Sequence, residues 1–296
     1  MGPASSTSCL MTCRTRLSSS VTMGNGPVES LRNRSGIMAC DTARRRHMQH
    51  TQYISTRGQM APAGFMDVLL AGLAPDGGLA VPERLPALTP EHLETWRSLN
   101  YAELATEVIA LFATDIPRKD LAALTRAAYG ESRFPQPVVP VTGLDDVADG
   151  LVLVGLSEGP TMAFKDLAMQ FLGQAIPYVL AKQGKVLNIL GATSGDTGSA
   201  AEHAFRGQEG VSVFMLSPAG RMSPVQRAQM YTLQDANIHN IAVRGVFDDC
   251  QALVKALSND ANFKAAHHLG AVNSINIGRI AAQAVYYVWS WLRVTD

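Results

Sequence analysis

The stretch GPTMAFKDLAMQ (159–170) places a single lysine, Lys165, between a turn and an apolar run. Phe164 precedes it, and a lysine beside apolar surface loses hydration, which disfavours its charged form and lowers its pKa. A neutral amine is a nucleophile toward an aldehyde, so Lys165 could form a covalent bond with an aldehyde cofactor. Taken alone, the stretch favours a simpler interpretation, an exposed lysine at the start of a helix.

A second stretch, GATSGDTG (191–198), follows a predicted strand directly and opens a predicted helix. Its glycines let backbone N–H groups approach a ligand, and a helix N-terminus favours an anion. The spacing excludes a P-loop, a dinucleotide-binding G-x-G-x-x-G loop and a nucleophile elbow around Ser194. We predict an anion-binding loop that uses the hydroxyls of Thr193, Ser194 and Thr197. For the loop alone, a glycine-rich helix cap is the somewhat favoured alternative.

Two further polar loops are each associated with an arginine, Arg221 or Arg279, and the first of them, at 217–230, follows a predicted strand. A guanidinium can hold a phosphate or a carboxylate through two hydrogen bonds, although a lone arginine is usually solvated. The second loop also carries a polar cluster, for which an Asx-turn with capping is the alternative interpretation. The cluster consists of Asn273, Ser274 and Asn276.

The order of predicted elements defines the fold class as α/β. Strands are expected at 151–154, 186–190, 211–216 and 238–243, and helices at 165–182, from 198, from 223, at 246–258 and at 276–292. Repeated strand–helix units imply a parallel sheet covered on both faces. Ligands bind at the carboxyl ends of such strands, so the polar loops should meet at one sheet edge. Pro177 is expected to kink its helix.

The preceding part of the chain is expected to be mainly helical. Residues 65–83 predict a helix that stops at a Gly-Gly turn, followed by a short extended piece. Residues 88–130 predict two or three amphipathic helices, the first with Thr89 as N-cap and Pro90 as its first residue.

Charge and composition restrict the partners. The formal net charge is zero and no apolar run could span a bilayer, so we expect no nucleic acid and no membrane partner. A small molecule or another copy of the chain fits better, and the protein would be a monomer or a homodimer. Cys9 and Cys13 lack a second ligand pair, so we expect no metal site and a reduced, cytoplasmic protein.

Residues 1–47 contain seven arginines and two acidic residues. This composition is typical of a transit peptide, but also of a disordered extension or of untranslated upstream sequence. We favour the latter two, because Met48 begins a plausible protein start.

Several stretches from residue 48 onward together resemble threonine synthases of the bacterial and fungal branch. They are, in order, YISTRG (53–58), DGGLAVPE (76–83), GPTMAFKD (159–166), GATSGDTGSAA (191–201), GRMSPVQRAQM (220–230) and GAVNSIN (270–276). The resemblance implies fold type II of the pyridoxal 5'-phosphate (PLP) enzymes, the tryptophan-synthase-β-like fold. It also implies a lyase that converts O-phospho-L-homoserine and water to L-threonine and phosphate.

The resemblance implies roles for individual residues. Lys165 would bind PLP covalently and then move the substrate Cα proton, and Asp196 would lie near the 3-hydroxyl of PLP. The hydroxyl loop at 193–197 would grip the substrate carboxylate. The candidates for the substrate phosphate are Arg221, Ser223, Asn273, Ser274 and Arg279.

The resemblance also implies a division of the chain. We expect a domain at 48–146 and the first part of the PLP-binding domain at 147–296. A later PTGNFGD-like segment that holds the PLP phosphate in the family is not in this sequence. We therefore expect a C-terminally truncated chain with little or no activity in isolation.

Two alternatives remain. One is a serine/threonine dehydratase or cysteine synthase, against which the SGDTG loop and the paired arginines argue. The other is a non-catalytic remnant that binds phosphorylated ligands.

Overall fold

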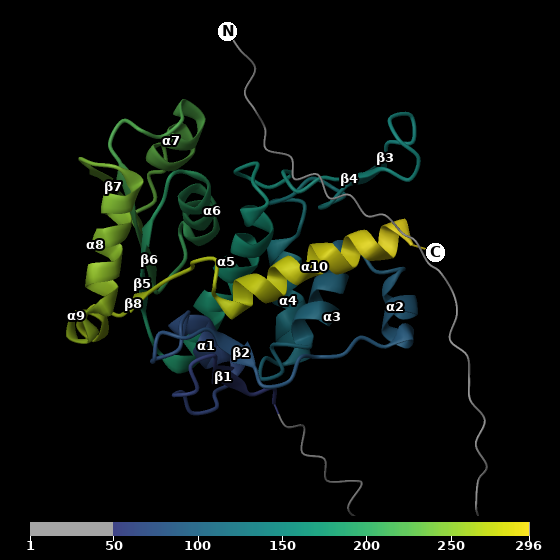
Figure 1. Ribbon diagram of the computed structural model, residues 1–296, viewed down its shortest axis with the longest axis horizontal. Helices are drawn as coiled ribbons and strands as arrows, with labels where there is room; N and C mark the ends of the chain where they lie inside the picture. Colours follow the sequence, from purple (N-terminus) through teal and green to yellow (C-terminus); the bar gives the residue numbers. More distant parts are fainter. Residues whose placement is uncertain (1–49, 296) are drawn as a thin grey trace, which may run out of the picture. The chain divides into compact units, whose positions relative to one another are not determined.

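The computed structural model describes residues 50–295 of the 296-residue chain (Figure 1). The expectations for residues 1–47, including Cys9 and Cys13, lie outside this range. The chain divides into two compact units. Of the described residues, the small unit holds residue 50 and Gly143–Leu153, and the main unit holds Thr51–Thr142 and 154–295.

The small unit is a turn closed by a backbone hydrogen bond from Leu144 to the Leu151 carbonyl (2.8 Å). The flanking strands β3 (Val141–Gly143) and β4 (Val152–Val154) form a two-stranded sheet of their own. The prediction of a strand at 151–154 is therefore confirmed, but its place in the parallel sheet was wrong. Strands of a parallel sheet are buried on both faces, whereas Leu153 in β4 is exposed.

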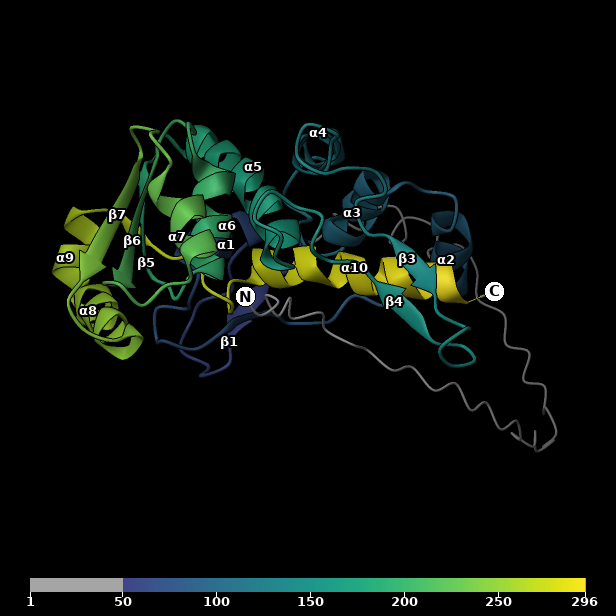
Figure 2. The same ribbon diagram turned by 90° about the horizontal axis from the view of Figure 1, so that it is seen from above.

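The main unit contains the expected parallel sheet, in the order β7-β6-β5-β8. Every neighbouring pair is parallel. Helices α8 and α9 cover one face, and α6 and α7 lie on the other (Figure 2). The elements are β5 (Leu187–Ala192), α6 (Asp196–Phe205), β6 (Val211–Pro218), α7 (Pro224–Tyr231), β7 (Ile238–Val243), α8 (Phe247–Asn259), α9 (Ala261–Ala266) and β8 (Leu269–Gly270). Because the strands are parallel, the loops after β5, β6 and β8 leave the same edge of the sheet.

Helix α5 (Lys165–Gln183) is the buried centre of this unit and runs on through Pro177. It packs against α6 at Gly173, where a Cβ atom would lie only 2.3 Å from the Ala204 carbonyl oxygen. The helix ends at Gly184, whose φ of 62° is the left-handed conformation that glycine adopts at helix ends. Because α5 is packed against α6 in this way, its first residue, Lys165, is held at a defined position.

The helical part of the main unit packs against α5 from the other side. The expectation of two or three helices is met by three, and Thr89 caps the first, accepting a hydrogen bond from the His92 backbone N–H (3.3 Å). The elements are β1 (Tyr53–Ser55), α1 (Phe65–Ala71), β2 (Ala80–Pro82), α2 (Pro90–Trp96), α3 (Tyr101–Ala110) and α4 (Arg118–Ala128).

Helix α10 (Ile277–Val294) joins the two parts of the main unit by packing on α5 and α3 (Figure 1). At its start, the Asn276 side chain donates to the Leu69 carbonyl of α1 (2.9 Å). Farther along, the Trp289 ring N–H donates to the Val139 carbonyl (2.9 Å). Among residues 50–295, no helix has the length and apolarity needed to cross a bilayer.

Candidate active site

The loop that leads into Lys165 is held by a buried carboxylate. Asp166 accepts hydrogen bonds from the Thr161 backbone N–H (2.8 Å) and hydroxyl (2.7 Å). Burial raises the pKa of Asp166, and the bonds from Thr161 oppose that rise. A Cβ atom at Gly159 would lie 2.4 Å from the Cβ of Asp166, so only glycine fits there. These contacts fix the position at which the Lys165 side chain leaves helix α5.

The Lys165 amine forms an ion pair with Asp196, with 2.8 Å between Nζ and Oδ2. The lysine side chain is 17% exposed and the aspartate side chain 49%, so the pair opens to solvent on the carboxylate side. The hydrogen bond from Lys165 is the main cause that lowers the pKa of Asp196. The sequence predicted an amine against apolar surface, and the Phe164 ring does lie 4.7 Å from Nζ. The Lys165 amine is therefore held between an apolar ring and a carboxylate.

Sequence reasoning missed Gln226, which extends this pair into a chain of hydrogen bonds. Its side-chain amide donates to Asp196 Oδ1 (2.5 Å), and its amide oxygen accepts from the Ser223 hydroxyl (3.0 Å). Ser223 is also the N-cap of α7. The spacing Ser-x-x-Gln at a helix start is a capping-box signal that could have drawn attention to Gln226. Three helices, α5, α6 and α7, therefore meet at Asp196.

The hydroxyl loop after β5 divides into one buried and two accessible side chains. Thr193 is 2% exposed, and its hydroxyl oxygen accepts from the backbone N–H groups of Gly195 (3.0 Å) and Gly198 (2.9 Å). Ser194 is exposed and Thr197 is partly buried. Neither hydroxyl has a hydrogen-bond partner within the described part of the chain. Helix α6 starts at Asp196, two residues before the predicted position, so Asp196 and Thr197 lie in its first turn.

The remaining candidates follow β6 and β8. Arg221 and Ser274 are exposed, and their side chains have no partner among residues 50–295. The Asn273 side chain accepts from the Ile275 backbone N–H (3.2 Å), as in an Asx-turn. The structure thus brings Lys165, Asp196 and Ser223 into one hydrogen-bonded group, and no direct hydrogen bond joins the other candidates to it.

Arg279 in the first turn of α10 has an unusual environment. It is 3% exposed, and burial lowers its pKa. Its buried Nε has no hydrogen-bond partner, and no carboxylate of the described residues pairs with it. A buried charge without a partner is costly, so an anion is the natural complement of this guanidinium.

Solved threonine synthases have the same fold. The PLP-bound enzyme from Brucella melitensis matches with a TM-score of 0.78 and 43% identity, over 83% of this chain and 52% of that one. The yeast enzyme matches with a TM-score of 0.75 and 39% identity, over 82% and 50%. The chain therefore has the α/β fold type II of the PLP-dependent enzymes, the class expected from the sequence.

Sequence comparison narrows this class to one family. Residues 52–129 match the family described as "Threonine synthase N terminus". The threonine synthase of Corynebacterium glutamicum is 56% identical over 249 residues, which are 82% of this chain and 51% of that protein. That of Methylobacillus glycogenes is 53% identical, with 52% of its length covered. The chain belongs to the threonine synthase family, and it spans about half the length of the curated relatives it matches.

Proposed function

We propose that this chain serves the threonine synthase reaction, in which O-phospho-L-homoserine and water become L-threonine and phosphate, with PLP bound at Lys165. The observation that carries the proposal is the Lys165–Asp196 pair at 2.8 Å in a member of this family. It lies beside a glycine-rich helix start at the carboxyl end of β5. Ligands of open α/β sheets bind at this edge.

The donor set fits PLP and a phosphorylated amino acid. An amine suits an aldehyde, and Asp196 can accept a hydrogen bond from a ring hydroxyl. The free hydroxyls of Ser194 and Thr197 suit a carboxylate at a helix N-terminus. The unpaired guanidinium of Arg279 suits a phosphate dianion.

The chain's own residues have separate tasks in this proposal. Bound PLP would stabilise the negative charge that develops on the substrate carbons. Lys165, released from the cofactor, would move the proton at the substrate Cα. Asp196 and Gln226 would orient the amine and the cofactor ring. The remaining candidates for the substrate phosphate are Arg221, Ser223, Asn273 and Ser274.

Two of the candidate substrate-binding residues, Thr193 and Ser223, already use part of their hydrogen-bonding capacity within the chain. The Thr193 oxygen caps α6, so only its hydroxyl proton remains for a substrate carboxylate. The Ser223 hydroxyl donates to Gln226, so it would have to turn to meet a phosphate. Arg279 therefore has the strongest support among the phosphate candidates.

A substrate comparison tests the reaction. The PLP-loaded chain is incubated with O-phospho-L-homoserine or with L-serine, and phosphate, threonine and keto acid are measured together with the change in PLP absorbance. We expect little turnover, but a phosphohomoserine-dependent absorbance change that Lys165→Ala abolishes. Lys185→Ala, an exposed lysine two residues before β5, should behave as wild type. A response to serine and none to phosphohomoserine would favour a dehydratase. Binding that survives Lys165→Ala would favour a non-catalytic remnant.

We also propose a cytoplasmic location and either a monomer or a homodimer. The only cysteine of the described residues, Cys250, is a buried free thiol, which suits a reducing compartment. Sedimentation of the purified chain at several concentrations would distinguish the two assembly states.

A further inference from the structure

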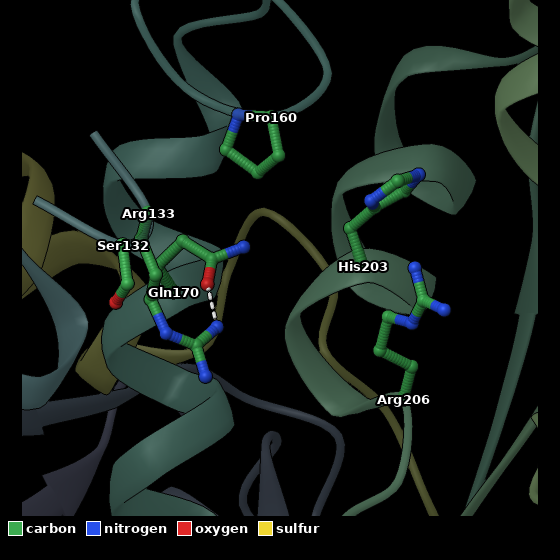
Figure 3. A pocket seen from close by; sticks show the side chains of 6 residues that line it. All are labelled: Ser132, Arg133, Pro160, Gln170, His203 and Arg206. Carbon is green, nitrogen blue, oxygen red and sulfur yellow. Dashed lines mark hydrogen bonds between the residues drawn. The ribbon is translucent and has the colours of Figure 1, made fainter. Parts of the chain in front are cut away.

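A polar pocket lies between the loops that follow α4 and precede α5, the second turn of α5 and the end of α6 (Figure 3). Its volume of about 290 Å³ is near the lower end of small-ligand sites, which span about 300–1,000 Å³. None of the lining side chains is acidic, and three are basic. They are Ser132, Arg133, Pro160, Gln170, His203 and Arg206.

The positive charge of the pocket is incompletely balanced. Arg133 is partly buried, which lowers its pKa, and it pairs with no carboxylate among residues 50–295. Its Nη1 donates to the amide oxygen of Gln170. Arg206 has one ion pair, 2.9 Å from Nη2 to Asp235 Oδ2, and stands on the opposite wall beside His203 (Figure 3). Cationic groups therefore face the same space from two walls, the loop after α4 and the end of α6.

Gln170 supplies the second, independent sign of a missing ligand. Its side chain is fully buried, and its amide nitrogen has no hydrogen-bond partner in the described part of the chain. Figure 3 shows this nitrogen directed from α5 toward the His203 side of the pocket. A buried donor without an acceptor costs about 1–3 kcal/mol. The Arg133 bond fixes the amide so that its N–H groups, not its oxygen, face the pocket.

We propose that this pocket binds a phosphate group, either as inorganic phosphate or as a phosphomonoester, at a site separate from Lys165. A tetrahedral oxyanion offers several acceptors at once. One oxygen can meet Gln170 and Arg133 on the α5 side, and others can meet Arg206 on the α6 side. His203 lies beside Arg206, with its Nε2 3.1 Å from the Gln229 carbonyl oxygen. A planar carboxylate has only two oxygens and would leave one wall unmatched. Five of the six lining side chains are polar or charged, so the pocket offers an apolar ligand little surface to bury.

The test is a titration of the chain with inorganic phosphate, read from the NMR signal of the His203 ring at constant ionic strength. We expect a saturable shift in wild type. Gln170→Glu keeps the shape of the side chain but gives Arg133 a carboxylate partner, so the affinity should fall about tenfold or more. Arg206→Gln should also weaken binding. Gln234→Glu adds the same charge at an exposed position outside the pocket and should leave the affinity unchanged.

Two further measurements identify the ligand and show whether its site is separate from Lys165. O-phosphoserine that binds more tightly than phosphate points to a phosphomonoester, and the reverse order points to the free ion. Lys165→Ala should leave the His203 shift intact. The proposal is overturned if wild type shows no saturable shift, or if chloride gives the same one. It is also overturned if neither pocket variant weakens binding, or if Lys165→Ala abolishes the shift.

Discussion

Replacing Glu202 by glutamine should remove a large pH dependence from the stability of this protein. Glu202 lies on α6 and is fully buried. One of its oxygens accepts a hydrogen bond from the Asn240 side chain (3.2 Å), and the other has no partner among the described residues. Burial raises the pKa of this carboxyl to about 8 from 4.5. The folded protein therefore holds a proton at pH 7 that the unfolded chain releases.

The sign and size of the effect follow from these two values. Below about pH 4.5 the carboxyl is protonated in both the folded and the unfolded state, so it does not change the free energy of unfolding. Between the two values unfolding releases a proton, so the free energy of unfolding falls by about 1.4 kcal/mol for each pH unit. From pH 6 to pH 8 the loss is about 2 kcal/mol, because the slope flattens as the folded state also ionises.

Urea unfolding at pH 6 and pH 8 measures this loss. Wild type should lose about 2 kcal/mol more than Glu202→Gln over this interval, since all other groups titrate equally in both proteins. Glu209→Gln removes an exposed carboxyl just beyond the same helix and should keep the wild-type slope. Equal slopes for wild type and Glu202→Gln would show that the buried carboxyl is charged in the folded state, and the reasoning would fail.

Two further substitutions test the packing that positions the site. Gly173→Ala should destabilise the protein by about 1–3 kcal/mol, because the new Cβ would meet the Ala204 carbonyl oxygen at 2.3 Å. The measurement is the melting temperature, which should fall. A higher melting temperature, as alanine gives in an ordinary helix, would contradict the close approach of α5 and α6. Asn276→Ala should lower the free energy of unfolding by urea by about 2 kcal/mol. It removes two buried hydrogen bonds, one donated to the Leu69 carbonyl and one accepted from the Gly278 N–H. An unchanged urea midpoint would mean that these two bonds do not hold α10 in place.

Much of the fold follows from simple sequence patterns. The segments VLNIL, VSVFML and IHNIAV each contain four or five apolar residues, and each forms a parallel strand. The elements that were missed are the short ones. Strand β8 has two residues, Leu269–Gly270. It pairs with β5 because the chain after α9 comes back alongside that strand. A period of two residues cannot be recognised in so short a piece.

The strand at 151–154 shows a different limit. Its apolar residues predict extended structure, but not which strand it pairs with. Pairing depends on contacts between distant parts of the chain, and the nearest partner here is the neighbouring β3. Local pattern and sheet membership are therefore separate questions.

The candidate site was predictable in its location but not in its contacts. Loops after parallel strands meet at one edge, so the grouping of the polar loops follows from the alternation of strands and helices. The Asp196–Gln226 bond depends on how far α7 approaches α6, which no spacing along the chain reveals. The bond between Arg133 and Gln170 likewise joins segments 37 positions apart. Such contacts need packing geometry.

Reductive trapping identifies the lysine that binds PLP. The chain is mixed with PLP at low concentration, reduced with borohydride, digested and mapped by mass spectrometry. We expect the phosphopyridoxyl label on the peptide that contains Lys165, and its loss in Lys165→Ala but not in Lys185→Ala. A label spread evenly over the surface lysines, or one that stays undiminished in Lys165→Ala, would show that PLP does not bind at Lys165.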